Sequence, residues 1–581
     1  MFTVLCLISL PIRASSVIWQ GVPEHQPTEA VSGELVVEMQ NNTVTGKISS
    51  LQAKSSVTNG EFNLVFKDPE NALRVLGEFR AYVTSQGDIH GHWVQPKLVR
   101  RTNAQFATPV RLQQNGARYV GTVTPLNDGI SVFFKATEAQ SNRYRLSVFT
   151  PENNGGRYYR NTELVFDGNQ ARIVQQSENG EQVLAYGSHD VEKNTFSFNF
   201  PYWGGKYNFK KISNDSHEML AFDEAPQYVQ PETLNDGWTT GDIAQSGIVL
   251  SEVIAFVKER QQSPPQTPHE AQLQALLIAQ HGKLIFEQYF RGFKRDEAHD
   301  LRSASKSLTG ILPGLVEYAR NEGRDGKTSS FQSSILETPI YQTLGYPTDV
   351  DSKNGILLKH ALSMSTGLDC DDNNYESPGN EENLQNQIAQ PDWYTYILDQ
   401  HLLHTPGEVN LYCSAGINLA GAIASAKAGH WIPRIIDDLF ARPLNIDLYH
   451  ANLQPNGDQA YSGGGLYLRG RDFLKLGQLM LDGGIWNNQR LLSEDYVEAV
   501  LSVHGEMFGQ GYGLGWWIRE YPVGDKSYTA YYASGNGGQQ VFIVPELGLT
   551  VAFLNSAFNT QGSRIAREDW FPNWVLARMV K

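Results

Sequence analysis

The sequence predicts a multidomain protein, with an all-β N-terminal part followed by a part in which helices and strands alternate. A chain of 581 residues is too long for one hydrophobic core and should divide into two or three domains. From residue 17 to 212, short alternating polar and apolar runs are separated by Asn, Asp and Gly, which is typical of antiparallel strands. After residue 248, helical patterns occur between apolar strands.

The composition is that of an ordinary globular protein. The net charge is -15 and the sequence pI is about 5.4. Lys and Arg form no block along the chain, so neither a nucleic-acid partner nor an anionic membrane has electrostatic support.

The N-terminus predicts a signal peptide over residues 1–16. The apolar run from residue 2 to 12 is too short to span a bilayer, and Arg13-Ala14-Ser15-Ser16 follows it. We therefore expect a periplasmic or secreted protein. The alternative is that this segment forms a first β-strand.

The all-β part, residues 17–212, contains no convincing amphipathic helix and predicts a sandwich or a barrel. The clearest strands are residues 33–39, 62–66, 119–123, 130–134 and 144–149. Its aromatic residues fill the core or, as the less favoured alternative, line a sugar- or peptide-binding face. They include Tyr158, Tyr159, Phe196, Phe198, Tyr202 and Trp203.

Residues 213–247 are rich in Asn, Asp, Pro and Gly and predict a linker or an ordered strap between domains. A helix over residues 249–260 follows and ends at a proline-rich tract. Next come a buried strand over residues 275–279 and a hairpin partner over residues 284–290.

The candidate nucleophile is Ser303, at the start of a predicted helix over residues 302–318. Positions i and i+3 share a helix face, so the Lys306 ammonium should lie beside the Ser303 hydroxyl. Ser305 and Ser307 adjoin Lys306 in sequence and should point elsewhere. Ser-x-x-Lys alone also occurs in ordinary helices, and its interpretation depends on later motifs.

Residues 356–368 predict a helix that Gly367 stops. The acidic segment that follows, residues 369–374, has oxygen ligands for Ca²⁺ but lacks the spacing of a known calcium loop. A capped, solvated loop is the favoured interpretation, and we expect no metal.

Tyr412 precedes a predicted helix of small and apolar residues. A nearby cation favours a phenolate, so Tyr412 beside Lys306 would give Ser303 a base. The hydroxyl of Ser414 would hold the lysine or contact the substrate. The alternative is a tyrosine that only packs at a helix start.

A glycine-rich segment, residues 533–539, leads into a predicted strand over residues 540–545. Glycine lets a backbone approach a ligand closely, and a strand N–H can then complete an oxyanion hole with the Ser303 N–H. The candidates are Ser534, Gly535, Asn536 and Gly537. The alternative is a plain glycine-rich hairpin.

Three cysteines are present, and Cys6 lies in the predicted signal peptide. Cys370 and Cys413 remain, which is the right number for one disulfide in an oxidising compartment. Two unrelated buried thiols are the alternative.

Together, the three motifs resemble a serine hydrolase family that includes class C β-lactamases, D-Ala-D-Ala peptidases, family VIII carboxylesterases and 6-aminohexanoate-dimer hydrolase. Residues 299–302, 364–368 and 512–517 also look like this family, and the resemblance covers about residues 230–581. It implies a hydrolase domain over residues 248–581, with a central antiparallel sheet flanked by helices and an all-helical subdomain. It also implies an acyl-enzyme mechanism without metal or organic cofactor.

Two motifs depart from that family. Tyr412-Cys413-Ser414 stands where class C enzymes have Tyr-x-Asn, and Ala533-Ser534-Gly535 stands where relatives have Lys-Thr-Gly or His-x-Gly. Without that cation, recognition of a penicillin carboxylate is weakened. We therefore expect an esterase or amidase acting on a small ester, amide or peptide, rather than a true β-lactamase.

The alternative function is a non-catalytic ligand- or cell-wall-binding protein, or a β domain that binds polysaccharide or a cell surface. Several aromatic residues suggest that the cleft tolerates apolar groups. These are Trp393, Tyr512, Trp516 and Trp517.

Overall fold

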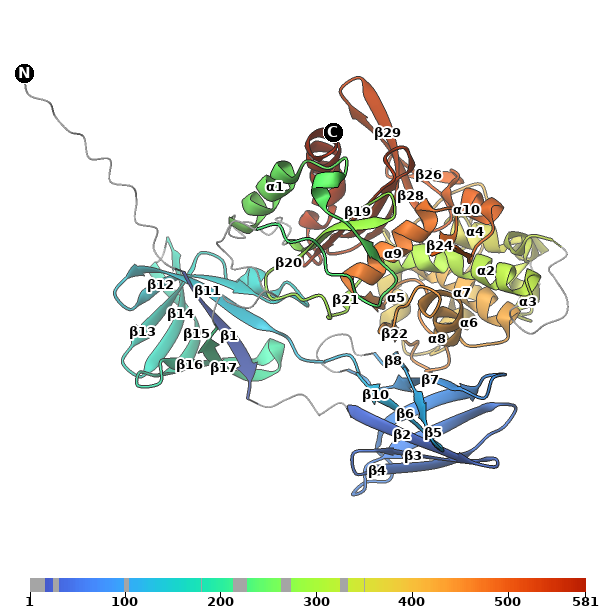
Figure 1. Ribbon diagram of the computed structural model, residues 1–581, viewed down its shortest axis with the longest axis horizontal. Coiled ribbons are helices and arrows are strands. Elements are labelled where there is room, and N and C mark those ends of the chain that lie inside the picture. Colours follow the sequence, from blue (N-terminus) through green and yellow to red (C-terminus); the bar gives the residue numbers. More distant parts are fainter. Residues whose placement is uncertain are drawn as a thin grey trace, which may run out of the picture.

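The computed structural model describes residues 16–24, 31–98, 104–178, 180–212, 227–262, 273–323, 333–348 and 351–581. It has three parts, a β-barrel, a β-sandwich and a larger α/β domain (Figure 1). The predicted signal peptide lies outside the described residues, except for Ser16, where the first strand begins.

The barrel closes in the order β1-β11-β12-β13-β14-β15-β16-β17. Its core is aromatic, and the rings of Phe134 and Phe209 stack with centroids 4.2 Å apart. The strands are β1 (Ser16–Pro23), β11 (Val132–Gln140), β12 (Arg143–Phe149), β13 (Thr162–Asp167), β14 (Gln170–Ser177), β15 (Gly180–Asp190), β16 (Thr195–Phe200) and β17 (Gly205–Lys211).

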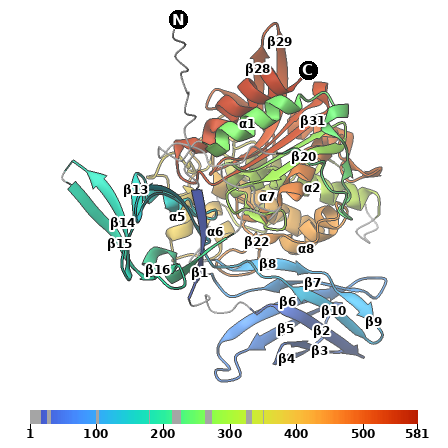
Figure 2. The ribbon, with the colours of Figure 1, turned by 60° about the vertical axis from the view of Figure 1, so that its left-hand side comes forward.

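The sandwich lies between β1 and β11 in sequence and beside the α/β domain in space (Figure 2). One sheet has the order β4-β3-β2-β10-β9, and the other includes β5, β6, β7 and β8. The strands are β2 (Gly33–Gln40), β3 (Thr43–Ile48), β4 (Leu51–Ser56), β5 (Glu61–Lys67), β6 (Val75–Val83), β7 (Ile89–Val94), β8 (Phe106–Val110), β9 (Gln113–Asn115) and β10 (Arg118–Val123).

The second sandwich sheet continues into the α/β domain. There β8 pairs with β22 (His450–Asn452), β22 pairs with β23 (Leu466–Leu468), and β23 pairs with β21 (His299–Asp300). This sheet therefore ends three residues before Ser303.

The all-β prediction for the N-terminal part is confirmed, but its strands form two units rather than one. Because β1 pairs with both β11 and β17, the barrel closes without the strands between β1 and β11. Those strands bury a separate core. Among the aromatic residues of the barrel, Phe196 and Trp203 are buried, whereas Tyr158 and Tyr202 are exposed.

Residues 227–247 form an ordered strap against the α/β domain. Trp238 is buried, and β18 (Thr239–Thr240) pairs in parallel with β20 (Lys283–Tyr289). Residues 213–226 of the predicted linker lie outside the described residues.

The α/β domain has a nine-stranded sheet in the order β18-β20-β19-β31-β30-β29-β28-β27-β26. All of its pairings except β18 with β20 are antiparallel. The remaining strands are β19 (Leu273–Gln280), β26 (Gly505–Met507), β27 (Gln510–Tyr512), β28 (Trp517–Val523), β29 (Lys526–Gly535), β30 (Gln539–Val544) and β31 (Leu549–Asn555), and a separate hairpin pairs β24 (Ile485–Trp486) with β25 (Gln489–Arg490).

Helices cover both faces of this sheet. On one face, Phe542 stacks on Phe571 of η10 (Ala566–Met579), and Phe553 packs on Phe256 of α1 (Leu250–Gln262). On the other, Gly477 of α9 (Gly470–Leu481) lies against β30 and β31. The alternation of side chains along each strand separates these two faces.

A helical subdomain adjoins the sheet, and α2 packs against α7 within it (Figure 1). Its helices are α2 (Ser305–Asn321), α3 (Ile340–Thr343), α4 (Leu358–Leu362), α5 (Glu381–Asn386), α6 (Trp393–Leu398), α7 (Ser414–Ala428) and α8 (Ile432–Ile436), and α10 (Glu494–Leu501) follows later. The predicted α/β architecture with a helical subdomain is confirmed.

The helix predicted over residues 356–368 is wrong in length, because only α4 (Leu358–Leu362) is helical there. Met364 has a φ of 60°, in the left-handed region, and this turns the chain before Gly367 is reached.

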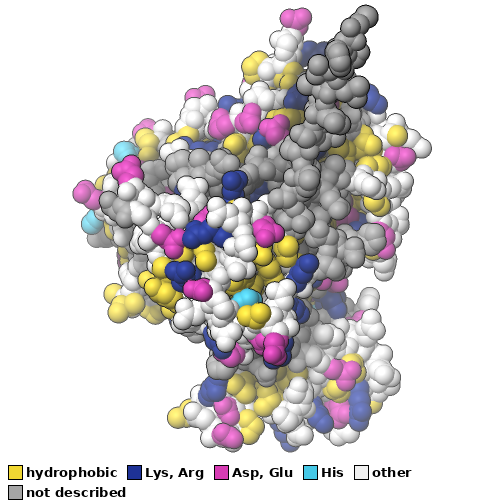
Figure 3. All heavy atoms as spheres, turned by 90° about the vertical axis from the view of Figure 1, so that its left-hand side faces the viewer, with side chains coloured by type: hydrophobic (Ala, Val, Ile, Leu, Met, Phe, Trp, Pro, Cys, Tyr) yellow, Lys and Arg dark blue, Asp and Glu magenta, His cyan; other side chains and the backbone are white. Residues whose placement is uncertain are grey.

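In the part of the chain that the structure describes, helices are too short or too polar to cross a bilayer. On the face seen in Figure 3, basic and acidic side chains are interspersed.

Candidate active site

Ser303 lies in a sharp turn, η4 (Arg302–Ala304), between β21 and α2. It therefore precedes the α-helix instead of lying in its first turn. Arg302 has a φ of 49°, a conformation that costs a non-glycine residue about 1–3 kcal/mol. Asp300 compensates, because its Oδ1 accepts the Arg302 N–H at 3.0 Å and its Oδ2 pairs with Arg302 Nε at 2.8 Å.

Lys306 reaches Ser303 from the first turn of α2. Its Nζ donates to Ser303 Oγ at 2.9 Å and to the Gly463 carbonyl at 2.6 Å, and the side chain is buried. The neighbouring serines point elsewhere. Ser305 Oγ accepts the Leu466 N–H at 3.1 Å, and Ser307 Oγ donates to a backbone carbonyl.

Tyr412 lies just before α7, and the centroid of its ring is 5.0 Å from Lys306 Nζ. Burial lowers the pKa of Lys306, but Tyr412, Glu381 and Asp372 together outweigh burial and raise it above its ordinary value. Lys306 is therefore an ammonium group at neutral pH, held between the Ser303 hydroxyl and the side chain of Tyr412.

Ser414 binds Asp372 instead of facing the cleft. Its N–H and its hydroxyl both donate to Asp372 Oδ2, at 2.9 and 2.6 Å, and Ser414 is fully buried. Burial and the nearby Glu381 raise the pKa of Asp372 to about 6. The Ser414 hydroxyl therefore donates to Asp372, a carboxylate near Lys306.

The sequence patterns did not indicate the loop that supports Lys306 from behind. Tyr461 OH donates to Glu381 Oε1 at 2.8 Å, and Tyr461 is buried edge-on against Trp393. Gly463 follows, and a Cβ there would lie 2.5 Å from the Ser414 carbonyl. The glycines after Tyr461 were the one available signal, but these contacts span 80 residues or more.

The glycine-rich end of β29 packs against the Ser303 turn. A Cβ on Gly535 would lie 2.0 Å from the Leu301 carbonyl oxygen and 3.0 Å from the Ala304 nitrogen, so only glycine fits. Asn536 follows directly. Among the described residues, no turn or loop hydrogen bond engages the backbone N–H of Ser303 or Asn536.

Ser534 is separate from this group. Its Oγ accepts hydrogen bonds from Gln540 Nε2 at 3.1 Å and from Arg567 at 3.5 Å. Arg567 belongs to η10, so the serine side chain lies on the sheet face that η10 covers.

Aromatic rings form one side of the site. Tyr412 stacks with Trp517 at 6.0 Å, and Phe508 lies 6.4 Å from Tyr412 and 6.1 Å from Trp517. Phe508 has a φ of 54° and is 63 % exposed, in the turn between β26 and β27. Phe508 therefore adds an exposed apolar ring to this side of the site.

The other residues predicted to line the cleft are core residues. Trp393, Tyr512 and Trp516 are at most 6 % exposed. Trp516 Nε1 donates to the Ser307 carbonyl at 3.2 Å, which fixes the β27–β28 connection to α2.

A disulfide bond joins Cys370 and Cys413, whose Cα atoms are 5.5 Å apart. It ties the acidic segment to the chain beside Tyr412. The carboxylates of that segment accept protein hydrogen bonds, with Asp371 bound to Asn373 and Asp369 bound to Ser377.

One group in the described residues has the spacing of a metal site, namely His90, Asp437 and Asp438. Arginines already neutralise it, because Asp437 pairs with Arg111 at 2.6 Å and with Arg442 at 2.8 Å.

A serine bound by a buried lysine, beside a tyrosine and a glycine-lined strand end, is the arrangement of a serine hydrolase. The chain belongs to the beta-lactamase family, whose model (Beta-lactamase) matches residues 269–570, more than half of the chain. This confirms the family that the motifs suggested.

Individual relatives match about half of the chain. The 6-aminohexanoate-dimer hydrolase of Paenarthrobacter ureafaciens is 23% identical over 300 residues, which cover 48% of this chain and 72% of that protein. A putative 6-aminohexanoate-dimer hydrolase from Bacillus anthracis has a TM-score of 0.43 at 17% identity, over 52% of this chain and 78% of its own. A family VIII carboxylesterase has a TM-score of 0.41 at 13% identity, over 55% and 95%.

Replacing both Cys370 and Cys413 with serine should lower the free energy of unfolding by about 2–4 kcal/mol, because the unfolded chain gains freedom when the disulfide is lost. The two cysteines are 43 residues apart. Urea denaturation of variant and wild type, each with and without reductant, measures this. If reductant shifts the variant as much as the wild type, the disulfide is not the cause.

Asp372→Asn should change how stability depends on pH between about 4 and 6. The folded carboxyl has a pKa of about 6 against 3.8 for a free one, so it binds its proton more tightly than the unfolded chain does. Stability from this group is therefore lost as pH rises through that window. Asparagine removes this slope, whereas Asp495→Asn at an exposed position should keep it. Parallel stability curves for wild type and Asp372→Asn would contradict the assignment.

Proposed function

We propose that this chain cleaves esters or amides by two-step acyl transfer, with Ser303 as nucleophile. The observation that carries the proposal is the 2.9 Å hydrogen bond from the buried Lys306 ammonium to Ser303 Oγ. A buried cation on a serine hydroxyl stabilises the alkoxide that forms on attack.

In the proposed mechanism, Tyr412 in its phenolate form accepts the Ser303 proton, because Lys306 already carries its own. Ser303 Oγ bonds to the substrate carbonyl carbon, and the negative charge moves to the carbonyl oxygen. The N–H groups of Ser303 and Asn536 would donate to that oxygen. Collapse expels the alcohol or amine, which takes the proton back from Tyr412.

Water then attacks the acyl-enzyme in the second step. Tyr412 takes the proton from water, and Ser303 leaves as the alkoxide and is reprotonated through Tyr412. Lys306 keeps its charge throughout, so its task is to stabilise each anion in turn. Apart from this water, every group that acts on the substrate in this cycle belongs to the chain.

The surroundings of the site favour an uncharged substrate with an apolar group. Ala533, at the position where relatives have a cation, is buried and cannot bind a carboxylate. The exposed ring of Phe508 beside Tyr412 supports binding of an alkyl or aryl group. We place the hydrolase unit at residues 248–581, and the disulfide supports a periplasmic or secreted location.

Ser303→Ala should abolish covalent labelling by a fluorophosphonate probe, because the probe needs the serine oxygen. Ser305→Ala is the matched control, since its hydroxyl binds the Leu466 N–H and not Lys306. Labelling should be followed by gel fluorescence alongside thermal unfolding. Labelling of folded Ser303→Ala would refute the nucleophile.

Wild type and Ser303→Ala also distinguish the proposed enzyme from the alternative, a non-catalytic binding protein. Wild type should turn over p-nitrophenyl acetate, and Ser303→Ala should not. A wild type that labels once but releases no product after the first turnover would favour the binding protein.

Phe508→Ala should reduce the preference in kcat/KM for esters with longer acyl chains. Each buried methylene contributes about 0.8 kcal/mol, or roughly fourfold in kcat/KM, where an apolar surface receives it. We expect p-nitrophenyl butyrate and hexanoate to lose about five- to tenfold, while the acetate changes less than twofold. Leu73→Ala, which removes an exposed side chain of the sandwich, is the control. Equal losses for all chain lengths would exclude an acyl-binding role.

A further inference from the structure

Residues 557–559, which follow β31, form a loop that contacts residues beside the proposed oxyanion hole, namely Asn536, Gly537 and Arg302. The Ala557 N–H donates to the Gly537 carbonyl at 3.1 Å. Asn559 exchanges two hydrogen bonds with Asn536, since its N–H donates to Asn536 Oδ1 at 2.8 Å and its Oδ1 accepts from Asn536 Nδ2 at 2.6 Å. The loop therefore sets where the Asn536 backbone lies.

The ring of Phe558 connects this loop to the Ser303 turn. The Arg302 guanidinium lies 5.3 Å from the ring centroid, and the His299 ring stacks on it at 5.9 Å. A Cβ on Gly537 would also lie 2.6 Å from the ring. One buried ring thus packs between the residue before Ser303 and the residue after Asn536.

The barrel holds this loop through Arg157. Arg157 Nη1 donates to the Phe558 carbonyl at 2.8 Å, across 401 residues of sequence. Arg157 lies in η1 (Gly155–Tyr158), which is fixed to the barrel because the Gly156 N–H donates to Thr150 Oγ1 at 2.9 Å. A Cβ on Gly156 would lie 2.1 Å from the Val148 carbonyl oxygen, so η1 sits directly on β12.

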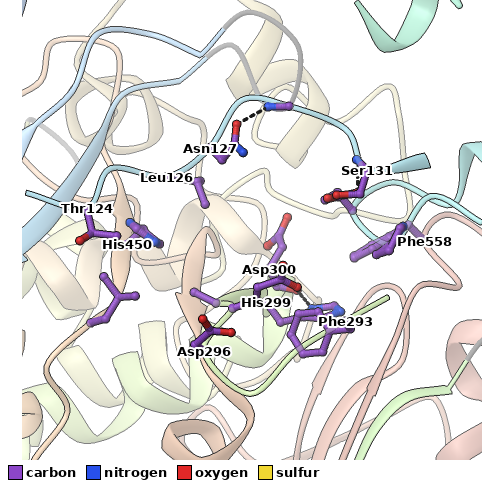
Figure 4. Close-up of a pocket in the computed structure, with 16 residues that line it drawn as sticks. Thr124, Leu126, Asn127, Ser131, Phe293, Asp296, His299, Asp300, His450 and Phe558 are labelled. Atoms are coloured by element: carbon purple, nitrogen blue, oxygen red, sulfur yellow. Dashed lines mark hydrogen bonds between the residues drawn. The ribbon is translucent and has the colours of Figure 1, made fainter. Parts of the chain in front are cut away.

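A second contact from the barrel reaches His299, whose ring stacks on the ring of Phe558. The Pro151 carbonyl accepts from Gln274 Nε2 at 3.0 Å, and Gln274 Oε1 contacts His299 Nε2 at 2.5 Å. A cavity of about 180 Å³ is lined by Pro151, His299 and Phe558, among others. In Figure 4, Ser131 lines it from the barrel, and His299 and Phe558 line it from the α/β domain.

We propose that Arg157 of the barrel is a positioning residue for the oxyanion hole, acting through the Phe558 carbonyl and the loop at residues 557–559. This rests on the proposed function, because it assumes that the Asn536 N–H stabilises the oxyanion. It assigns the barrel a part in catalysis through the position of this loop.

The expected effect follows from what an oxyanion donor contributes. Deleting one donor outright costs about 10²–10³ in kcat. Arg157→Ala leaves the donor present but less well held, so we expect kcat to fall about tenfold to thirtyfold. KM should stay within twofold, because the ground-state carbonyl depends less on these donors.

The test uses the full chain with p-nitrophenyl acetate, and phenylboronic acid as a probe that forms a tetrahedral adduct on Ser303. Arg157→Ala should lose kcat and boronate affinity by similar factors. Arg157→Lys should recover most of both, because an ammonium can still donate to the Phe558 carbonyl. A purely structural role would not couple boronate affinity to kcat in this way.

Two controls separate positioning from loss of fold. Tyr158→Phe removes the hydroxyl that the other Arg157 nitrogen contacts and should leave kcat unchanged. Arg143→Ala removes the barrel ion pairs with Glu163 and Glu181, and should lower the melting temperature without lowering kcat. If Arg157→Ala does not fold, Asn559→Ala tests the same loop from the α/β side and should lose kcat alike.

The proposal is overturned if Arg157→Ala keeps its kcat, or if its loss appears in KM while boronate affinity is unchanged. A different result is expected if the proposed function itself is wrong. In that case Ser303→Ala would still be labelled or active, whatever Arg157 does.

Discussion

The catalytic part of this protein depends on a buried ammonium group. Removing the Lys306 charge from water costs several kcal/mol unless hydrogen bonds and nearby anions replace the water. Here the Gly463 carbonyl and Ser303 Oγ supply the hydrogen bonds, and Glu381 and Asp372 supply the negative charge. The geometry around Ser303 follows from satisfying this one charge.

That requirement explains why so many distant segments meet here. Gly463 must present its carbonyl, so its loop packs against the start of α7, where a Cβ would collide. Asp372 must stay near the lysine, and Ser414 and the disulfide both hold its segment in place. Each of these residues holds a partner of Lys306 in place and so helps to stabilise its charge.

The Ser303 turn is also the meeting point of the three parts of the molecule. The sandwich sheet reaches it through β21, the nine-stranded sheet reaches it through Gly535, and the barrel reaches it through the loop that holds Phe558. A strained Arg302 persists there because contacts from all sides over-determine its conformation. The β-rich N-terminal part is therefore part of the architecture of the site and not an appended module.

Local sequence patterns predicted a large share of the fold and of the candidate site. Alternation identified strands such as β2 and β12, and helical spacing selected Ser303 over Ser305 and Ser307 as the partner of Lys306. These patterns failed where tertiary contacts overrode the local preference of the sequence. The helix at residues 356–368 stops at α4, and Trp393 and Trp516 are core residues while Phe508 is exposed.

The sequence by itself determined the fold class and the pair of Ser303 with Lys306, because these rest on periodicity and on spacings of a few residues. The family followed from the resemblance of its three motifs to known serine hydrolases. Only the tertiary structure decided the division of the β part into barrel and sandwich, and the roles of Glu381, Gly463 and Arg157. Those depend on contacts between residues 80 to 401 apart, which no local spacing encodes.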